Sequence, residues 1–208
     1  MLDRRDRILT VAQQLLDEGG VTGFTIRRLC ERADVSPRTI YYSFANKEEI
    51  VAAAIEHHMD TLRATLPPAP PSIDLQSVLQ QSDRMADYVV SLRRYAAAMV
   101  EVFFSPNGNG KIHESLTRIS NSGWIDRAES AGVIVKLPRS RRESLVLLLT
   151  NAAYANIGDF VSGRISEWAF RRRAKSNMLT ICFSALRPKF RAQAAGLLRQ
   201  MYSETDYN

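Results

Sequence analysis

The fold of this chain is decided by residues 25–44, which read TIRRLCERADVSPRTIYYSF. Hydrophobic side chains recur there every three or four positions on both sides of Asp34, as expected for two short amphipathic helices joined by a tight turn. Thr25 and Ser36 stand where the two helices would begin, and each offers a hydroxyl that can cap free backbone N–H groups. Pro37 strengthens the second start, because proline needs no N–H group at the first helical position. The segment therefore predicts a helix-turn-helix.

The two predicted helices have a buried and an exposed side. The positions expected to face inward are Ile26, Leu29, Cys30, Ala33, Val35, Ile40 and Phe44. The second helix would expose Pro37, Arg38, Thr39, Tyr42 and Ser43. A guanidinium, hydroxyls and an aromatic ring on one short helix are suited to base edges and phosphates in the major groove of DNA.

The distribution of charge supports DNA binding only locally. The chain carries a net charge of +6, but residues 1–63 hold 9 basic and 10 acidic side chains, whereas residues 64–208 hold 19 and 12. Between residues 25 and 47 there are five basic side chains and two acidic ones. Phosphate binding needs a basic surface at the contact itself, so this window, and not the overall charge, favours a nucleic-acid partner.

The rest of the 208-residue chain also has helical periodicity, which predicts an all-α fold. After the helix-turn-helix, further helices are expected at about 46–63, 73–104, 111–131, 140–162, 167–186 and 189–202. The proline-rich stretch 67–71 cannot be helical. We therefore expect three parts: a DNA-binding domain over 1–63, a linker over 64–72 and a larger helical domain over 73–208.

Several functional classes lack their usual signals in this sequence. The longest apolar runs, such as Leu145 to Leu149, are too short to cross a bilayer, and no leader peptide is recognisable. Cys30 and Cys182 are far apart and are expected to be reduced thiols in a cytoplasmic protein. Because there is no nucleophile elbow, dinucleotide fingerprint or metal-ligand cluster, we expect no enzyme activity, no cofactor and no metal site.

The run from Phe24 to Glu49 resembles the TetR/AcrR family of transcriptional regulators. The likeness covers about residues 5–60 and includes the turn, the recognition helix and the Phe-x-Asn-Lys-Glu sequence that follows it. The resemblance implies a homodimer that binds a palindromic double-stranded DNA operator and responds to a small-molecule effector. It also implies a dimer interface around 140–162 and 167–186, and glycine is usual in the family where this chain has Asp34.

The resemblance assigns roles to individual residues of the motif. Thr25 would cap the first helix near a phosphate, and Arg27 would reach a phosphate or a guanine edge. Tyr41 would direct its hydroxyl to a phosphate while its ring packs inward, and Lys47 would bind a phosphate at a helix N-terminus. The full set of candidate DNA-contacting residues is Thr25, Arg27, Ser36, Pro37, Arg38, Thr39, Tyr41, Tyr42 and Lys47.

Large pliable or aromatic side chains in the second domain could line an effector pocket, with a few polar groups to orient the ligand. The candidates are Met85, Tyr88, Phe103, Trp124, Asn151 and Tyr154. The effector itself is not identified by the sequence. Two alternatives stay open: a DNA-binding regulator that is controlled by a protein partner and has no small effector, and an all-α enzyme.

Overall fold

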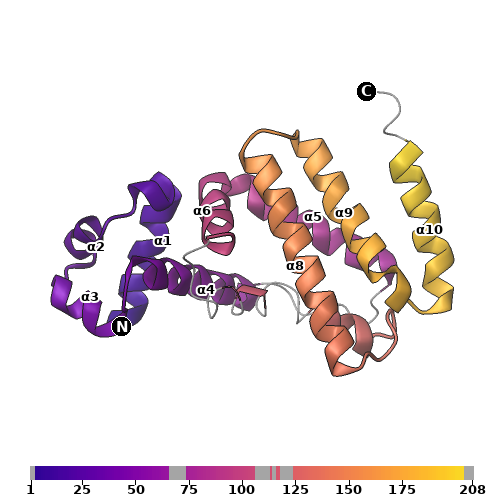
Figure 1. The fold of residues 1–208 in the computed structure, drawn as a ribbon, viewed down its shortest axis with the longest axis horizontal. Coiled ribbons are helices and arrows are strands. Elements are labelled where there is room, and N and C mark those ends of the chain that lie inside the picture. The colour runs from indigo at the N-terminus through magenta and orange to yellow at the C-terminus, as the bar shows by residue number, and fades with distance from the viewer. Residues whose placement is uncertain (1–2, 66–73, 106–112, 114–115, 118–123, 204–208) are drawn as a thin grey trace. The chain divides into compact units, whose positions relative to one another are not determined.

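The computed structural model describes residues 3–65, 74–105, 113, 116–117 and 124–203 (Figure 1). The named elements are α1 (Arg4–Gly23), α2 (Ile26–Ala33), α3 (Pro37–Ser43), α4 (Lys47–Thr65), α5 (Leu75–Ser91), α6 (Arg93–Phe103), α8 (Arg139–Val161), α9 (Glu167–Cys182), the short 3-10 helix η1 (Phe183–Ala185) and α10 (Pro188–Ser203). Residues 124–130 are also helical. The all-α prediction is confirmed, and the extended pairing in the described ranges is one isolated antiparallel bridge between Ile134 and Leu186. The proline-rich stretch 67–71 lies outside the described residues.

Packing divides the chain into two units. The first comprises residues 1–67 and 92–119, and the second comprises residues 68–91 and 120–208. The first unit therefore contains α6 in addition to the four N-terminal helices. The expected functional division at 64–72 remains a prediction, and it differs from this packing division in where α6 belongs.

The predicted long helix over 73–104 is two helices, because the backbone leaves the helical region at Leu92, with φ −117° and ψ 47°. The half after the break, α6, packs against α1 and α4. Tyr95 of α6 is buried, and its hydroxyl donates a hydrogen bond to the carbonyl oxygen of Ala54 at 3.5 Å. The side chain of Arg94 donates to the carbonyl oxygen of Glu18 at 2.9 Å. These contacts bury α6 in the core of the first unit, whereas α5 belongs to the second unit.

The core of the first unit is built on one face of α1. Its buried side chains recur at helical spacing: Ile8, Leu9, Ala12, Leu15 and Leu16. This face packs against α2, α4 and α6. Gly20 has φ 61° and ψ −166°, so the regular part of α1 ends there, and the chain turns toward the helix-turn-helix.

The second unit is organised around α8 and α9, which pack against each other, while α5 and α10 pack against α9. Arg142 of α8 forms ion pairs with Asp126 and Glu129, which attach the 124–130 helix to α8. By length and composition alone, α8 is one helix of the described chain that could cross a membrane, although its longest uninterrupted apolar run is short. Half of its most apolar window is buried inside this unit, as is usual for a core helix of a bundle.

Candidate nucleic-acid interface and ligand pocket

The two helices of the motif begin where the sequence predicts. The Thr25 side chain accepts a hydrogen bond from the backbone N–H of Arg28 at 3.2 Å, which caps α2. The Ser36 hydroxyl accepts from the backbone N–H of Thr39 at 3.2 Å, and Pro37 occupies the first turn of α3. These local bonds fix the start and therefore the direction of each short helix.

The start of α4 is held by a reciprocal cap between Asn46 and Glu49. The Asn46 side chain accepts a hydrogen bond from the backbone N–H of Glu49 at 2.8 Å. The Glu49 carboxylate reaches back and accepts from the backbone N–H of Ala45 at 2.6 Å. Phe44, immediately before this cap, is buried, so α3 is fixed to the core of the first unit at its C-terminal end.

The turn between α2 and α3 requires a left-handed backbone at Asp34, where φ is 51° and ψ is 57°. The Asp34 N–H donates to the carbonyl oxygen of Cys30 and closes the end of α2. Asp34 is the one residue other than glycine with a positive φ in the described part of the chain. This backbone conformation explains why glycine suits the position.

Replacing Asp34 with glycine is expected to raise the free energy of unfolding by about 0.5–1 kcal/mol. The left-handed conformation costs an L-residue about 1–2 kcal/mol, and the extra freedom of glycine in the unfolded chain offsets part of that gain. Urea unfolding followed by circular dichroism measures the change. The matched variant Asp34→Ala should instead be destabilised, because alanine has neither glycine's freedom nor the local hydrogen bonding of aspartate. A less stable glycine variant would contradict the role assigned to this turn.

The outer face of α3 is open to solvent. Tyr42 is 92% exposed, and Ser36, Pro37 and Arg38 are also exposed. The Thr39 hydroxyl lies 3.0 Å from the Ser36 hydroxyl. Ile40, on the opposite side, is fully buried. The helix therefore presents a polar and aromatic face whose position is fixed by its own buried side.

Tyr41 departs in part from its expected role, because its side chain is 57% exposed. The inward packing expected of this ring is therefore incomplete. Its exposure leaves the hydroxyl free to approach a phosphate, and that contact remains a prediction.

Two of the basic side chains near the motif, Arg28 and Arg32, have an acidic partner in α1. Glu18 accepts hydrogen bonds from Arg32 at 2.6 Å and from Arg28 at 3.3 Å. The hydrogen bond from Arg32 lowers the pKa of the Glu18 carboxyl below its ordinary value. Arg27 is far more exposed and donates to Glu31 on the next turn of α2 at 2.8 Å. Arg27 is thus the arginine of α2 that is best placed to exchange its partner for a phosphate.

Lys47, at the first position of α4, contacts the end of α1. Its ammonium group donates to the carbonyl oxygen of Val21 at 2.9 Å and lies 5.9 Å from the centre of the Phe24 ring. The bend at Gly20 ends the regular part of α1 just before Val21. Lys47 therefore links α4 to α1, and its predicted phosphate contact would have to be made beside or instead of this bond.

An apolar pocket of about 150 Å³ lies among α5, α8, α9 and the 124–130 helix. Its walls include two of the predicted ligand-binding residues, Met85 and Trp124. The full lining is Ser82, Met85, Ala86, Val89, Trp124, Leu149, Ala152, Ala153, Asn156, Ile157, Phe170, Ala174, Asn177, Met178 and Ile181. The residues of α8 in this set recur at helical spacing, so one face of α8 forms a wall.

Four predicted ligand residues lie away from this pocket. Asn151 is exposed, on the side of α8 opposite the lining face. Tyr154 is buried but also turned away from that face, and Tyr88 is offset from the lining positions of α5. Phe103 belongs to the first unit, where it stacks on His113 with ring centres 4.4 Å apart. Their roles in ligand binding remain predictions, without support from this pocket.

Asn156 is a buried polar residue of the pocket that was not among the predicted ligand residues, and neither were Ser82 and Asn177. The position of Asn156 follows Ala152 and Ala153 by one helical turn, and this run of small residues was the available signal for the lining face. The amide nitrogen of Asn156 donates to the carbonyl oxygen of Phe170 at 2.9 Å. Asn156 therefore joins α8 to α9 from inside the unit.

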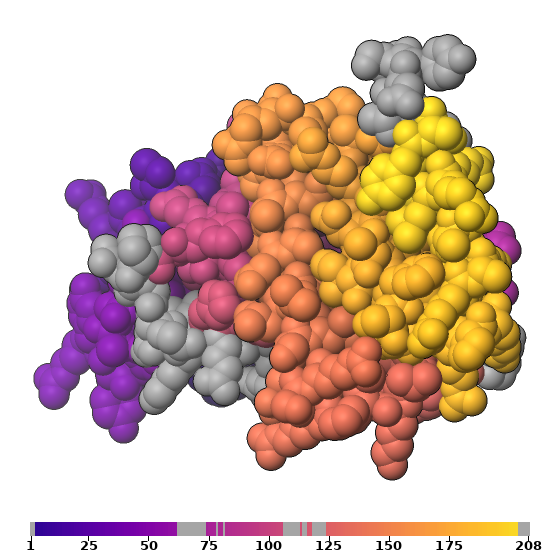
Figure 2. Space-filling model, turned by 45° about the vertical axis from the view of Figure 1, so that its right-hand side comes forward, coloured from indigo at the N-terminus to yellow at the C-terminus, as the bar shows by residue number. Residues whose placement is uncertain are grey.

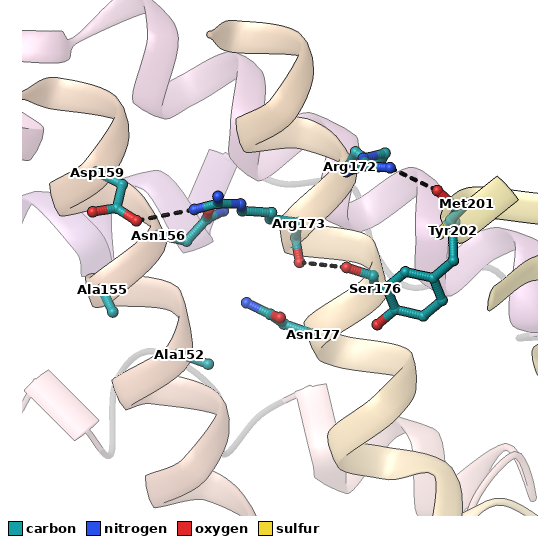
Figure 3. A pocket seen from close by; sticks show the side chains of 10 residues that line it. All are labelled: Ala152, Ala155, Asn156, Asp159, Arg172, Arg173, Ser176, Asn177, Met201 and Tyr202. Carbon is teal, nitrogen blue, oxygen red and sulfur yellow. Dashed lines mark hydrogen bonds and ion pairs between the residues drawn. The ribbon is translucent and has the colours of Figure 1, made fainter. Parts of the chain in front are cut away.

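A second, polar hollow of about 410 Å³ opens between α8, α9 and the end of α10 (Figure 3). In this view Arg173 of α9 reaches across to Asp159 of α8, with 3.0 Å between the bonded atoms. Arg172 donates to the carbonyl oxygen of Met201 in α10 at 2.7 Å. Asn156 and Asn177 line this hollow as well as the apolar pocket.

The two cysteines and His58 lie in structural surroundings. Cys30 and Cys182 are both free and buried, and burial raises the pKa of the Cys182 thiol to about 12. His58 packs edge-on against Tyr95 with ring centres 5.0 Å apart, and burial lowers its pKa. In the described ranges, no three His, Cys, Asp or Glu side chains gather as metal ligands.

Comparison with known proteins extends this picture beyond the motif. Residues 8–54 match the family model of bacterial regulatory proteins of the tetR family. The transcriptional regulator UidR of Escherichia coli K12 is 25% identical over 164 residues, which cover 74% of this chain and 81% of that protein. YvkB of Bacillus subtilis, an HTH-type transcriptional regulator by name, is 40% identical over 52 residues, or 25% of this chain and 28% of that protein.

Solved structures share the fold over most of the chain. A tetR-family regulator from Streptomyces coelicolor aligns with a TM-score of 0.64 and 17% identity, over 96% of this chain and 88% of that one. A TetR regulator from Rhodococcus sp. RHA1 aligns with a TM-score of 0.61 and 20% identity, over 84% and 94%. The combination of an N-terminal helix-turn-helix and a following helical part is therefore shared beyond residues 8–54.

Proposed function

On the premise that this chain is a transcriptional regulator of the TetR family, we propose that it is a repressor. It binds a palindromic operator as a homodimer, and it leaves the operator when a small molecule binds its second unit. The observation that carries the proposal is α3. Its buried residue Ile40 fixes the helix, while Arg38 and Tyr42 face solvent with groups that can read bases.

A dimer follows from the size of the reading surface. A helix of seven residues, such as α3, is about 10 Å long and can read only a few base pairs. Two copies on successive major grooves supply the missing specificity. Exposed apolar side chains on α8 and α9, namely Leu147, Leu148 and Trp168, support a dimer interface there. Figure 2 shows the face of the second unit that α8, α9 and α10 form.

The apolar pocket supports control by a small molecule. It lies in the second unit, whereas the reading helix belongs to the first. A ligand releases DNA when it binds more tightly to a form of the dimer whose two α3 helices no longer match the spacing of the operator. We expect a saturating ligand to weaken operator binding by about 5–150-fold, the usual range of coupling between two sites.

Base reading and phosphate binding are expected to separate in two variants. Arg38→Ala should change the sequence preference of the protein, because a lost bidentate base contact costs about 1–3 kcal/mol at one position of the operator. Lys47→Met removes the charge but keeps the length of the side chain, and should weaken binding about equally on all sequences. Selection from a randomised duplex library, followed by fluorescence anisotropy, measures both effects.

The matched control is Arg139→Ala, which removes an exposed arginine from the start of α8. It should leave the selected sequence unchanged. If wild-type protein selects no duplex, DNA reading by this chain is refuted. If both Arg38→Ala and Lys47→Met weaken all duplexes equally, the assignment of the groove-facing side of α3 is wrong.

A further inference from the structure

We propose that the pocket among α5, α8 and α9 binds an uncharged, mainly apolar ring compound whose N–H or O–H group donates a hydrogen bond to the side-chain oxygen of Asn156. The residues of the pocket are enough to define the chemistry of this ligand. Only its role as the effector that releases DNA depends on the function proposed above.

The central observation is the buried amide of Asn156, which is 5% exposed. Its nitrogen donates to the carbonyl oxygen of Phe170, and this bond fixes which end of the amide is the oxygen. The oxygen, Oδ1, is buried and accepts no hydrogen bond. A buried acceptor without a donor is costly, and folded proteins rarely retain one without a reason. This oxygen therefore indicates a ligand with an N–H or O–H group that can donate a hydrogen bond to it.

The walls of the pocket restrict the rest of the ligand. The described side chains that line it carry no charge, and its polar side chains are Ser82, Asn156 and Asn177. A charged ligand would lose its hydration there without gaining an opposite charge. Trp124 and Phe170 offer aromatic surfaces, and the thioether of Met178 makes favourable contacts with rings.

The volume of the pocket sets the size of the ligand. A cavity of about 150 Å³ with apolar walls is large enough for benzene, as an engineered cavity of that volume in another protein shows. The pocket also shares Ala152, Asn156 and Asn177 with the polar hollow on the other side of the α8–α9 pair. A ring compound can therefore fill the apolar pocket while its donor points to Asn156 at the shared wall.

The polar hollow does not favour an anion over this neutral donor. Arg173 is paired with Asp159, which also accepts a hydrogen bond from Arg164 at 2.7 Å. Arg172 is bonded to α10 and lies over the Trp168 ring, 4.8 Å from its centre. The side-chain oxygen of Asn156 is buried and has no donor, whereas Arg172 and Arg173 already have partners. An anion would also be repelled by that acceptor.

The test compares two probes of the same shape with the full-length protein. Indole presents one N–H donor, and benzofuran replaces that N–H with an oxygen atom that cannot donate. Isothermal titration calorimetry should show that indole binds about tenfold more tightly than benzofuran, the expected gain for one buried hydrogen bond. Equal affinity for the two probes, or the absence of saturable indole binding, would overturn the proposal.

Two substitutions in α8 assign the effect to a residue. Asn156→Leu keeps the branched shape but removes the acceptor, so the tenfold preference for indole should disappear while both probes still bind. Ser144→Leu changes an exposed polar residue of the same helix that does not line the pocket, and should leave the preference intact. If Asn156→Leu does not yield folded protein, Asn156→Gln displaces the carbonyl group and should reduce the preference. A preference that survives in the folded Asn156 variant would overturn the assignment.

The same samples separate this inference from the proposed function. Indole is added to the complex of the protein with its selected operator. If indole shows the tenfold preference but leaves operator affinity unchanged, the ligand chemistry stands and the effector role fails. If another compound releases the operator while indole and benzofuran bind equally, the proposed function stands and the assignment of Asn156 fails.

Discussion

Replacing Phe24 with alanine is expected to lower the free energy of unfolding by about 3–5 kcal/mol, a large share of the stability of an ordinary domain. Phe24 is fully buried where the chain passes from α1 to α2. Its ring also lies beneath the ammonium group of Lys47. The substitution therefore leaves a cavity beneath the start of α4 and removes a contact that holds α4 beside α1.

Urea unfolding of the full chain, followed by circular dichroism, measures the effect of Phe24→Ala. Phe104→Ala is the matched control, because it deletes the same side chain at a position that is 53% exposed. That variant should lose about 1 kcal/mol or less, mainly from its edge-to-face contact with Phe103. If the two variants are equally stable, Phe24 is not the anchor that its burial indicates.

Operator binding should fall by about 10²-fold when the salt concentration rises from 50 to 200 mM. In the proposed dimer, Arg27 and Lys47 of each subunit would supply roughly four cations to phosphates, and each neutralised phosphate contributes about −0.9 to the slope of log affinity against log salt. Anisotropy titrations at several salt concentrations give this slope. An affinity that does not change with salt would contradict the proposed phosphate contacts.

A variant with one positive charge fewer in each subunit tests this number of phosphate contacts. Arg27→Gln should reduce the magnitude of the slope by about two for a dimer, because it removes one cation from each subunit. Arg164→Gln removes an arginine that is paired with Asp159 in the second unit, and serves as the control. A slope that falls equally in both variants would indicate a general effect of net charge, without contacts at the motif.

The helix starts were predictable because their causes lie within a few residues. Thr25, Ser36 and Asn46 each accept a bond from a backbone N–H three residues further along. The break at Leu92 was not predictable, since no glycine or proline marks it and the hydrophobic pattern continues through it. It arises because α6 finds its buried partners in the first unit, whereas α5 packs in the second. A periodic pattern shows that a face is buried but does not show against which core.

The two candidate sites, the exposed face of α3 and the ligand pocket, also differ in how far the local sequence predicts them. The exposed face of α3 follows from local periodicity, so the exposure of Arg38 and Tyr42 was predictable. The ligand pocket depends on the rotation of α8 about its axis, and this is set by its packing against α9, which is distant in the sequence. Choosing large and polar residues near the centre of α8 gave Asn151 and Tyr154, whereas the lining face is marked by small residues and contains Asn156.

The packing of α6 with the N-terminal helices limits how hybrid regulators can be made from this chain. The polypeptide passes from one packing unit to the other after residues 67, 91 and 119. A chimaera joined at the proline-rich stretch would take α1 to α4 without α6, and would leave Ala54 and His58 without their contacts to Tyr95. Helices α1 to α4 therefore cannot be exchanged between regulators as a separate module. A hybrid protein that contains them must also include α6, or the surface that α6 covers must be redesigned.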